Sequence, residues 1–184
     1  MQGASKKRLA IGLLTLWIGA TTFAFWWLQA RLIKPFTEEY SAYADLAAIA
    51  VSTGQSDSRP IQVVELIDED CYCSRVNRDH RERVRQRYAN SQVAFVEVRP
   101  GEKLPSTAAA QLPDSIDRTS APSALVLNQQ GRLEYFGPYS FGAGCFTGNG
   151  THVERAIDRA LARQSRPQIN VIGNGCFCDW KIST

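Results

Sequence analysis

The sequence predicts an α/β domain, with a mixed sheet flanked by helices, preceded by one N-terminal transmembrane helix. Residues 9–28 contain no charged side chain, and a helix of that length spans about 30 Å, the thickness of a bilayer core. After this run, strand-like and helix-like stretches follow in the order β-α-β, an irregular segment, then β-β-α. Cys71 and Cys73 stand where the first strand-like run gives way to a helix-like stretch.

The N-terminal segment has the properties of an uncleaved membrane anchor. Three basic residues at positions 6–8 precede the apolar run, so the positive-inside rule places residues 1–8 in the cytoplasm and residues 9–30 across the membrane. The alternative is a cleaved signal peptide, but this run is longer than a signal sequence and ends in the bulky Trp26 and Trp27. We therefore expect a single-pass protein of the bacterial inner membrane, with its C-terminal domain in the periplasm.

Composition limits the partners and the compartment. Five of the 21 basic residues flank the anchor, so 16 remain against 18 acidic residues, and the outer domain is slightly acidic. Such a surface gives no case for nucleic-acid binding. All five cysteines follow residue 70, which beyond a membrane anchor implies an oxidising compartment. Their odd number leaves at least one thiol free or paired with a partner.

A stalk and a linker are expected between the anchor and the domain, over residues 31–59. Residues 36–51 have the apolar spacing of a helix, and residues 52–60 form a polar stretch of Gly, Ser and Pro. We therefore expect the globular domain to cover residues 60–166, followed by a cysteine-containing tail over residues 167–184.

The first half of this domain predicts a parallel βαβ unit. Residues 61–67 are a β-branched run, typical of a buried strand, and residues 74–89 are a charged surface helix with a narrow apolar stripe. Residues 93–98 form the next strand, which returns parallel to the first. An irregular segment with one short helix at 106–111 follows.

The second half predicts a hairpin and a helix. Residues 123–127 and 133–139 are strands joined by a turn in which Gly131 supplies positive φ. A glycine-rich loop leads to the last helix, residues 151–163, which starts with a capping-box sequence.

Two cysteines at C-x-C spacing cannot pair easily with each other. In a helix, residues i and i+2 point about 200° apart, so the sulfurs of Cys71 and Cys73 converge only in the turn before the helix. A disulfide between them would be strained. The helix dipole lowers the thiol pKa, whereas the three acidic residues 68–70 raise it and favour a bound cation.

The other three cysteines are candidate neighbours. The predicted hairpin brings Cys145 to the same edge of the sheet as Pro122 and Cys71, as a resolving thiol or a third metal ligand. The last helix leads about 20 Å away from that edge, but the extended tail before Cys176 reaches about 30 Å. Cys176 and Cys178 can therefore return as auxiliary thiols, although nothing in the sequence compels them to do so.

This order of elements, with Cys71 at the first β-to-α junction and Pro122 before the third strand, resembles the thioredoxin-like superfamily over residues 60–163. The resemblance implies that Pro122 is a cis-proline packed against the redox cysteines and that Glu65 is a buried acid that assists proton transfer. The segment APSALVLNQQGRLEYFGPYS is similar to membrane-anchored extracytoplasmic bacterial members. The terminal GCFCDW is similar to a small Gram-negative thioredoxin-like family. This chain has C-x-C where the superfamily usually has C-x-x-C.

Three functions are compatible with these residues. The first is a thiol–disulfide oxidoreductase without a cofactor, in which Cys71 is the nucleophile, Cys73 the resolving thiol, Pro122 the docking element and Glu65 the proton carrier; its partner is a protein thiol substrate or a redox protein. The second is a soft-metal protein that holds Cu(I) or Zn(II) through Cys71 and Cys73. The third is a non-catalytic module of a membrane complex, with structural disulfides.

Overall fold

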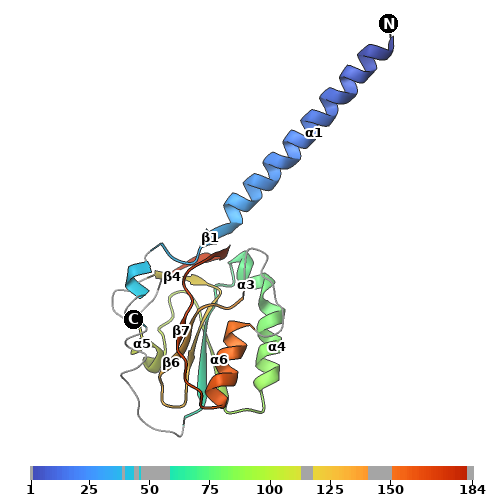
Figure 1. Cartoon of the computed structure of the whole chain (residues 1–184). Helices are drawn as coiled ribbons and strands as arrows, with labels where there is room; N and C mark the ends of the chain where they lie inside the picture. The colour runs from blue at the N-terminus through green and yellow to red at the C-terminus, as the bar shows by residue number, and fades with distance from the viewer. Residues whose placement is uncertain are drawn as a thin grey trace. The chain divides into compact units, whose positions relative to one another are not determined.

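A computed structural model of the chain separates into two compact units, Met1–Ile33 and Lys34–Thr184, shown in Figure 1. We describe each unit by itself. The structure describes residues 2–38, 40–43, 46, 59–112, 118–140 and 151–181.

The first unit is the helix α1 (Gln2–Leu32). Its segment Lys6–Arg31 is long and apolar enough to cross a membrane. The hydroxyls of Thr15 and Thr22 each donate a hydrogen bond to the carbonyl four residues earlier, both at 2.8 Å. A helix in lipid must satisfy its polar groups internally, and these side chains do so. The predicted apolar N-terminal helix is therefore confirmed.

The second unit is built on a five-stranded mixed sheet with the strand order β3-β2-β5-β6-β7. The pairs β2–β3 and β6–β7 are parallel, whereas β2–β5 and β5–β6 are antiparallel. The predicted mixed α/β class and the parallel unit at its start are confirmed. The strands are β2 (Ile61–Leu66), β3 (Val93–Val98), β5 (Ser123–Leu127), β6 (Leu133–Pro138) and β7 (Gln168–Ile169).

Alternating side chains of the sheet form two cores, one on each face. In β5, Ala124 and Val126 join the core beneath the helices α4 (Arg78–Tyr88) and α6 (His152–Leu161), which lie together in Figure 1. Leu125 and Leu127 face the opposite core. That second core is covered by the short helix α5 (Ser106–Ala109), the 3-10 turn η1 (Tyr40–Tyr43) and the C-terminal tail.

The segment after α1 belongs to the second core. Ile33–Pro35 is the short strand β1, and the aromatic ring of Phe36 packs edge-on against Phe136 at 6.1 Å. The ring of Tyr43 stacks on the other side, at 5.6 Å from Phe136, and Leu46 is fully buried. The second unit therefore begins at Lys34, earlier than the boundary at residue 60 that the linker composition indicated.

The helix predicted over 74–89 is divided in two. The first part, α3 (Tyr72–Val76), ends at Asn77, which has φ −85° and ψ −3° and separates it from α4. Asn77 is buried, and its side-chain amide donates to the hydroxyl of Ser140 at 3.3 Å. This tertiary contact overrides the helical periodicity.

Two local predictions are confirmed. Gly131 adopts φ 76° in the hairpin turn, a conformation that other residues rarely take. At the start of α6, the amide of Thr151 donates to the Glu154 carboxylate at 2.9 Å, and the Thr151 hydroxyl accepts from the Glu154 amide, which completes the capping box.

Candidate functional site

The first C-x-C motif lies where β2 passes into α3. A tight turn precedes it, in which the amide of Asp70 donates to the Asp68 carboxylate at 2.9 Å and the amide of Cys71 donates to the Asp68 carbonyl at 3.1 Å. Cys71 is the N-cap residue, with an extended backbone, and Cys73 lies within the first helical turn. Successive side chains of a helix are rotated by about 100° from one another. Because Cys71 lies outside the helix, this rotation does not fix the direction of its side chain.

The second C-x-C motif reaches the first through the tail. After β7 the chain passes close to Gly137 of β6, where an added Cβ would clash with the carbonyl oxygen of Asn170. The strands β8 (Asn174–Cys176) and β9 (Cys178–Lys181) follow. β9 pairs antiparallel with β4 (Arg118–Ala121), which places Cys178 opposite Ala121, while β8 pairs with β1.

The two motifs are joined by two disulfides. Cys71 is bonded to Cys178 and Cys73 to Cys176, with Cα–Cα distances of 6.0 and 5.5 Å. Both distances lie within the usual range for disulfides. The bridges close loops with sequence separations of 107 and 103 residues. The tail thus does return to the predicted edge, and each cysteine of the first motif meets a cysteine of the second.

Burial distinguishes the four sulfur-bearing residues. Cys71, Cys73 and Cys176 are only 3%, 2% and 6% exposed, whereas Cys178 is half-buried. The residues between the cysteines point in opposite directions: Tyr72 is exposed, and Phe177 packs edge-on against Phe36 at 5.3 Å. An attacking thiolate from outside therefore has its easiest approach at Cys178.

Pro122 lies next to this cluster. The peptide bond between Ala121 and Pro122 is cis, as the family resemblance implied. The Sγ atom of Cys71 lies 3.9 Å from the carbonyl oxygen of Ala121, and the amide of Tyr139 donates to the Pro122 carbonyl at 3.1 Å. The end of β4, the proline and the sulfur of Cys71 therefore lie next to one another, and all three residues are buried.

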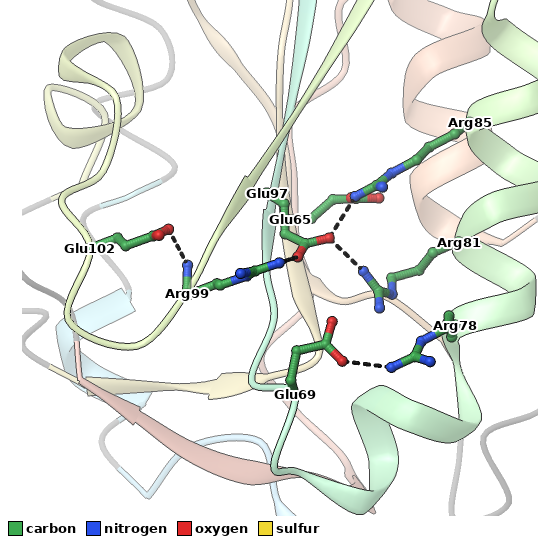
Figure 2. Close-up of polar contacts among 8 residues, drawn as sticks. All are labelled: Glu65, Glu69, Arg78, Arg81, Arg85, Glu97, Arg99 and Glu102. Carbon is green, nitrogen blue, oxygen red and sulfur yellow. Dashed lines mark hydrogen bonds and ion pairs between the residues drawn. The ribbon is translucent and has the colours of Figure 1, made fainter.

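Glu65 is held in a network of ion pairs beneath α4, shown in Figure 2. It is fully buried on β2, next to Glu97 of the paired strand β3. The guanidinium of Arg85 donates to Glu65, from Nε at 3.0 Å, and also to Glu97 at 2.9 Å. Arg81, itself buried, donates to Glu97 at 3.1 Å. These two arginines balance two carboxylates that would otherwise repel each other.

The pKa values of the two carboxylates in this network are shifted in opposite directions. Burial raises the pKa of Glu65 above its ordinary value, and the hydrogen bonds and charge of Arg85 offset this only in part. Burial also acts to raise the pKa of Glu97, but Arg85 and Arg81 together lower it. The described interactions of Glu65 lead to Arg85, Tyr139 and Arg81, and not to a cysteine.

The network was missed at the sequence level. The sequence predicts a charged surface helix over residues 74–89. In the structure, however, Arg81 is buried and Arg85 is partly buried. The signal was present: Glu65 and Glu97 lie at matching positions of two parallel strands, and Arg81 and Arg85 lie one helical turn apart. The third predicted thiol neighbour, Cys145, lies outside the described residues.

The fold and site define a mixed α/β domain with two adjacent disulfides, preceded by an apolar helix that can span a membrane. The chain belongs to the family described as "Domain of unknown function (DUF6436)", which matches residues 41–180 and so includes both C-x-C motifs. No curated protein and no solved structure matches the chain.

Proposed function

We propose that this protein is a membrane-anchored, thioredoxin-like thiol–disulfide oxidoreductase whose C-terminal domain faces the periplasm from the bacterial inner membrane. The observation that carries the proposal is the bond between Cys71, the N-cap residue of α3, and Cys178, on a C-terminal strand. The cis-proline beside Cys71 and the parallel and antiparallel strand pairs around it agree with the resemblance. The apolar helix α1 supports the anchor.

The exchange step uses Cys71 as nucleophile and Cys178 as resolving thiol. In the reduced protein, the Cys71 thiolate attacks one sulfur of a client disulfide, and the other client sulfur leaves as a thiolate and takes up a proton. The Cys178 thiolate then attacks the Sγ atom of Cys71, which forms the Cys71–Cys178 bond and releases the second client sulfur as a thiol. Two electrons thus pass from the protein to the client. A dithiol donor then supplies two further electrons, which reduce the Cys71–Cys178 bond again.

This scheme changes one role expected from the sequence. Cys73 was expected to resolve the intermediate, but its sulfur is bonded to Cys176, and Cys178 is bonded to Cys71. In the proposal, Pro122 is the docking element for the client beside Cys71. Glu65 carries a proton for the exchange, for which a raised pKa is suited.

The experiment is reduction of a model client disulfide by the full chain in detergent micelles, with a dithiol donor present. The wild-type protein should turn over, and Cys71→Ser should abolish turnover because it removes the nucleophile. Lys181→Ala, an exposed position on the same strand as Cys178, is the matched control and should retain turnover. A wild-type protein that stays inert across a wide range of redox buffers would rule the proposal out.

A non-catalytic domain with structural disulfides is the second candidate, and burial favours it. Cys71, Cys73 and Cys176 are each less than a tenth exposed, and Phe177 and Trp180 fix the tail in the second core. In that case, replacement of the cysteines should unfold the domain without a separate loss of chemistry. Circular dichroism on the same samples as the turnover assay distinguishes the two candidates.

A further inference from the structure

Three of the paired cysteines also form a compact cluster of sulfur atoms. The Sγ atoms of Cys71, Cys73 and Cys178 all lie within 4.8 Å of one another. In a tetrahedral zinc–thiolate site, bonds of about 2.3 Å place neighbouring sulfurs about 3.8 Å apart. Once the Cys71–Cys178 bond is reduced, the two sulfurs can separate to that spacing.

We propose that reduction of the two bridges converts this cluster into a thiolate site for Zn²⁺. Cys71, Cys73 and Cys178 supply three ligands, and Cys176, whose sulfur is bonded to that of Cys73, supplies the fourth. Four cysteine thiolates are a common ligand set for structural zinc. The inference goes beyond the proposed oxidoreductase: it concerns a resting ligand of the reduced protein, and the two share only the requirement that the bridges be reducible.

Zinc loading begins with reduction of the two bridges. Each bridge accepts two electrons and two protons from one dithiol, which leaves as a disulfide, so two dithiols yield four protein thiols. Zn²⁺ then binds the deprotonated sulfurs, and the thiol protons are released to solvent. No further oxidation or reduction occurs, because Zn²⁺ has no redox chemistry.

The ligands lie on elements that are held by hydrogen bonds and packing as well as by the bridges. The amide of Cys71 is hydrogen-bonded to the Asp68 carbonyl, and Cys178 is paired with Ala121 in the β4–β9 ladder. Trp180, two residues further along β9, is 3% exposed in the second core. The tail is thus held by packing as well as by sulfur, so the four thiols stay close together after reduction.

Burial of the cluster is the second observation that favours a metal. The acidic residues before Cys71 are engaged elsewhere, since the Asp68 carboxylate accepts from the amide of Asp70 and Glu69 is paired with Arg78. Three of the four cysteines are almost completely shielded from solvent, which limits competition by water for the metal. Burial without charge compensation would oppose four thiolates, and a divalent cation supplies that compensation.

The test measures zinc binding by the full chain in detergent, after reduction by a phosphine and removal of the reductant without oxygen. We expect one zinc per reduced chain and none per oxidised chain, by elemental analysis after gel filtration. Cys178→Ser should weaken the affinity, measured by competition with a chromogenic chelator, by about tenfold or more, since even outer-shell changes have effects of that size. Lys181→Ala, exposed on the same strand as Cys178, is the control and should bind as the wild type does.

A second measurement avoids variants that fail to fold. In the reduced wild-type protein, zinc should protect Cys71, Cys73, Cys176 and Cys178 from alkylation, mapped by mass spectrometry. Equal alkylation of these four with and without zinc, or loss of binding in Lys181→Ala but not in Cys178→Ser, would overturn the inference. A reduced protein that exchanges disulfides but takes up no zinc would overturn this inference alone and leave the oxidoreductase proposal standing.

Discussion

The two C-x-C motifs have the same spacing but are positioned by different forces. Cys71 and Cys73 lie at the start of α3, close to a charged helix whose arginines pair with buried carboxylates. Cys176 and Cys178 lie in a tail that is positioned by apolar packing and by strand pairing at its edge. The helical motif is placed by local structure, whereas the tail motif is placed by tertiary contacts.

The largest effect is expected when both bridges are removed together. The first bridge closes a loop with a separation of 107 residues, for which the chain-entropy model gives about 4–5 kcal/mol of stabilisation. Once it has formed, the second bridge closes only a small ring between the two motifs and adds much less. Replacement of all four cysteines by serine should therefore cost about 6–7 kcal/mol, and removal of either bridge alone about 2 kcal/mol.

Urea unfolding of the full chain in detergent measures these differences. The two single-bridge variants are Cys71→Ser with Cys178→Ser, and Cys73→Ser with Cys176→Ser. If each costs half of the combined effect, the bridges act independently, and the nested-loop explanation is wrong.

The apolar side of the comparison is tested by Trp180→Ala. Trp180 is 3% exposed in the second core, and truncation of a buried Trp costs about 3 kcal/mol or more. Under reducing conditions this variant should also release the tail, because packing is then its main attachment. Limited proteolysis of the tail measures the release. Lys181→Ala, on the same strand but exposed, is the matched control and should behave as the wild type; equal cleavage of both reduced variants would mean that packing does not hold the tail.

The ion pairs beneath α4 are tested by Glu65→Gln. The amide oxygen can still accept from Arg85, and Arg85 keeps Glu97, so we expect a loss of stability of about 1 kcal/mol. If Glu65 carries protons for exchange, the exchange rate should fall by more than this stability change explains. Glu69→Gln, which removes an exposed partner of Arg78, is the control and should change neither quantity measurably. An unchanged exchange rate in Glu65→Gln would assign Glu65 to structure alone.

The smallest effect is a dependence of stability on pH. Burial lowers the pKa of His80 below 6.5, and the charge of Glu154 offsets this only in part. The folded state therefore favours the neutral ring. The contribution of His80 to the free energy of unfolding is present above pH 6.5 and is lost as the pH falls toward the lower pKa of the folded state. Glu65 acts in the opposite direction: its pKa is raised, so its contribution is lost as the pH rises from 4.5 through the folded value.

The difference between the wild type and His80→Leu isolates the histidine. We expect the free energy of unfolding to fall less steeply in His80→Leu than in the wild type as the pH decreases from 7 to about 5, below the ordinary histidine pKa of about 6.5. Parallel curves for the two proteins would contradict the assignment.

The sequence predicted the elements whose information is local. The strands at 61–67 and 93–98, the Gly131 turn and the capping box at Thr151 depend on periodicity or on neighbouring residues, and each is confirmed. The break at Asn77 and the burial of Phe36 depend on contacts with Ser140 and Phe136, which no window of sequence contains.

The sequence could place Cys71 and Pro122 in the candidate site, but not the cysteines of the tail. The junction position of Cys71 follows from a strand followed by a helix, and its distance from Pro122 follows from the order of the strands. The partners of Cys71 and Cys73 depend on the path of the tail, which is set by close packing at Gly137 and by burial of Phe177. For that reason, chain length alone allowed the return of Cys176 and Cys178 but could not require it.

The nesting of the two bridges also determines how the molecule transmits mechanical force. Tension applied between the N-terminal helix and the C-terminus passes from Cys71 directly to Cys178, so the intervening 107-residue separation bears no load. At about 3.4 Å per residue, roughly 360 Å of chain is shielded from extension while the bridges are intact. Reduction makes this length available, so a single-molecule pulling experiment should record a much longer extension in the presence of a dithiol than in its absence.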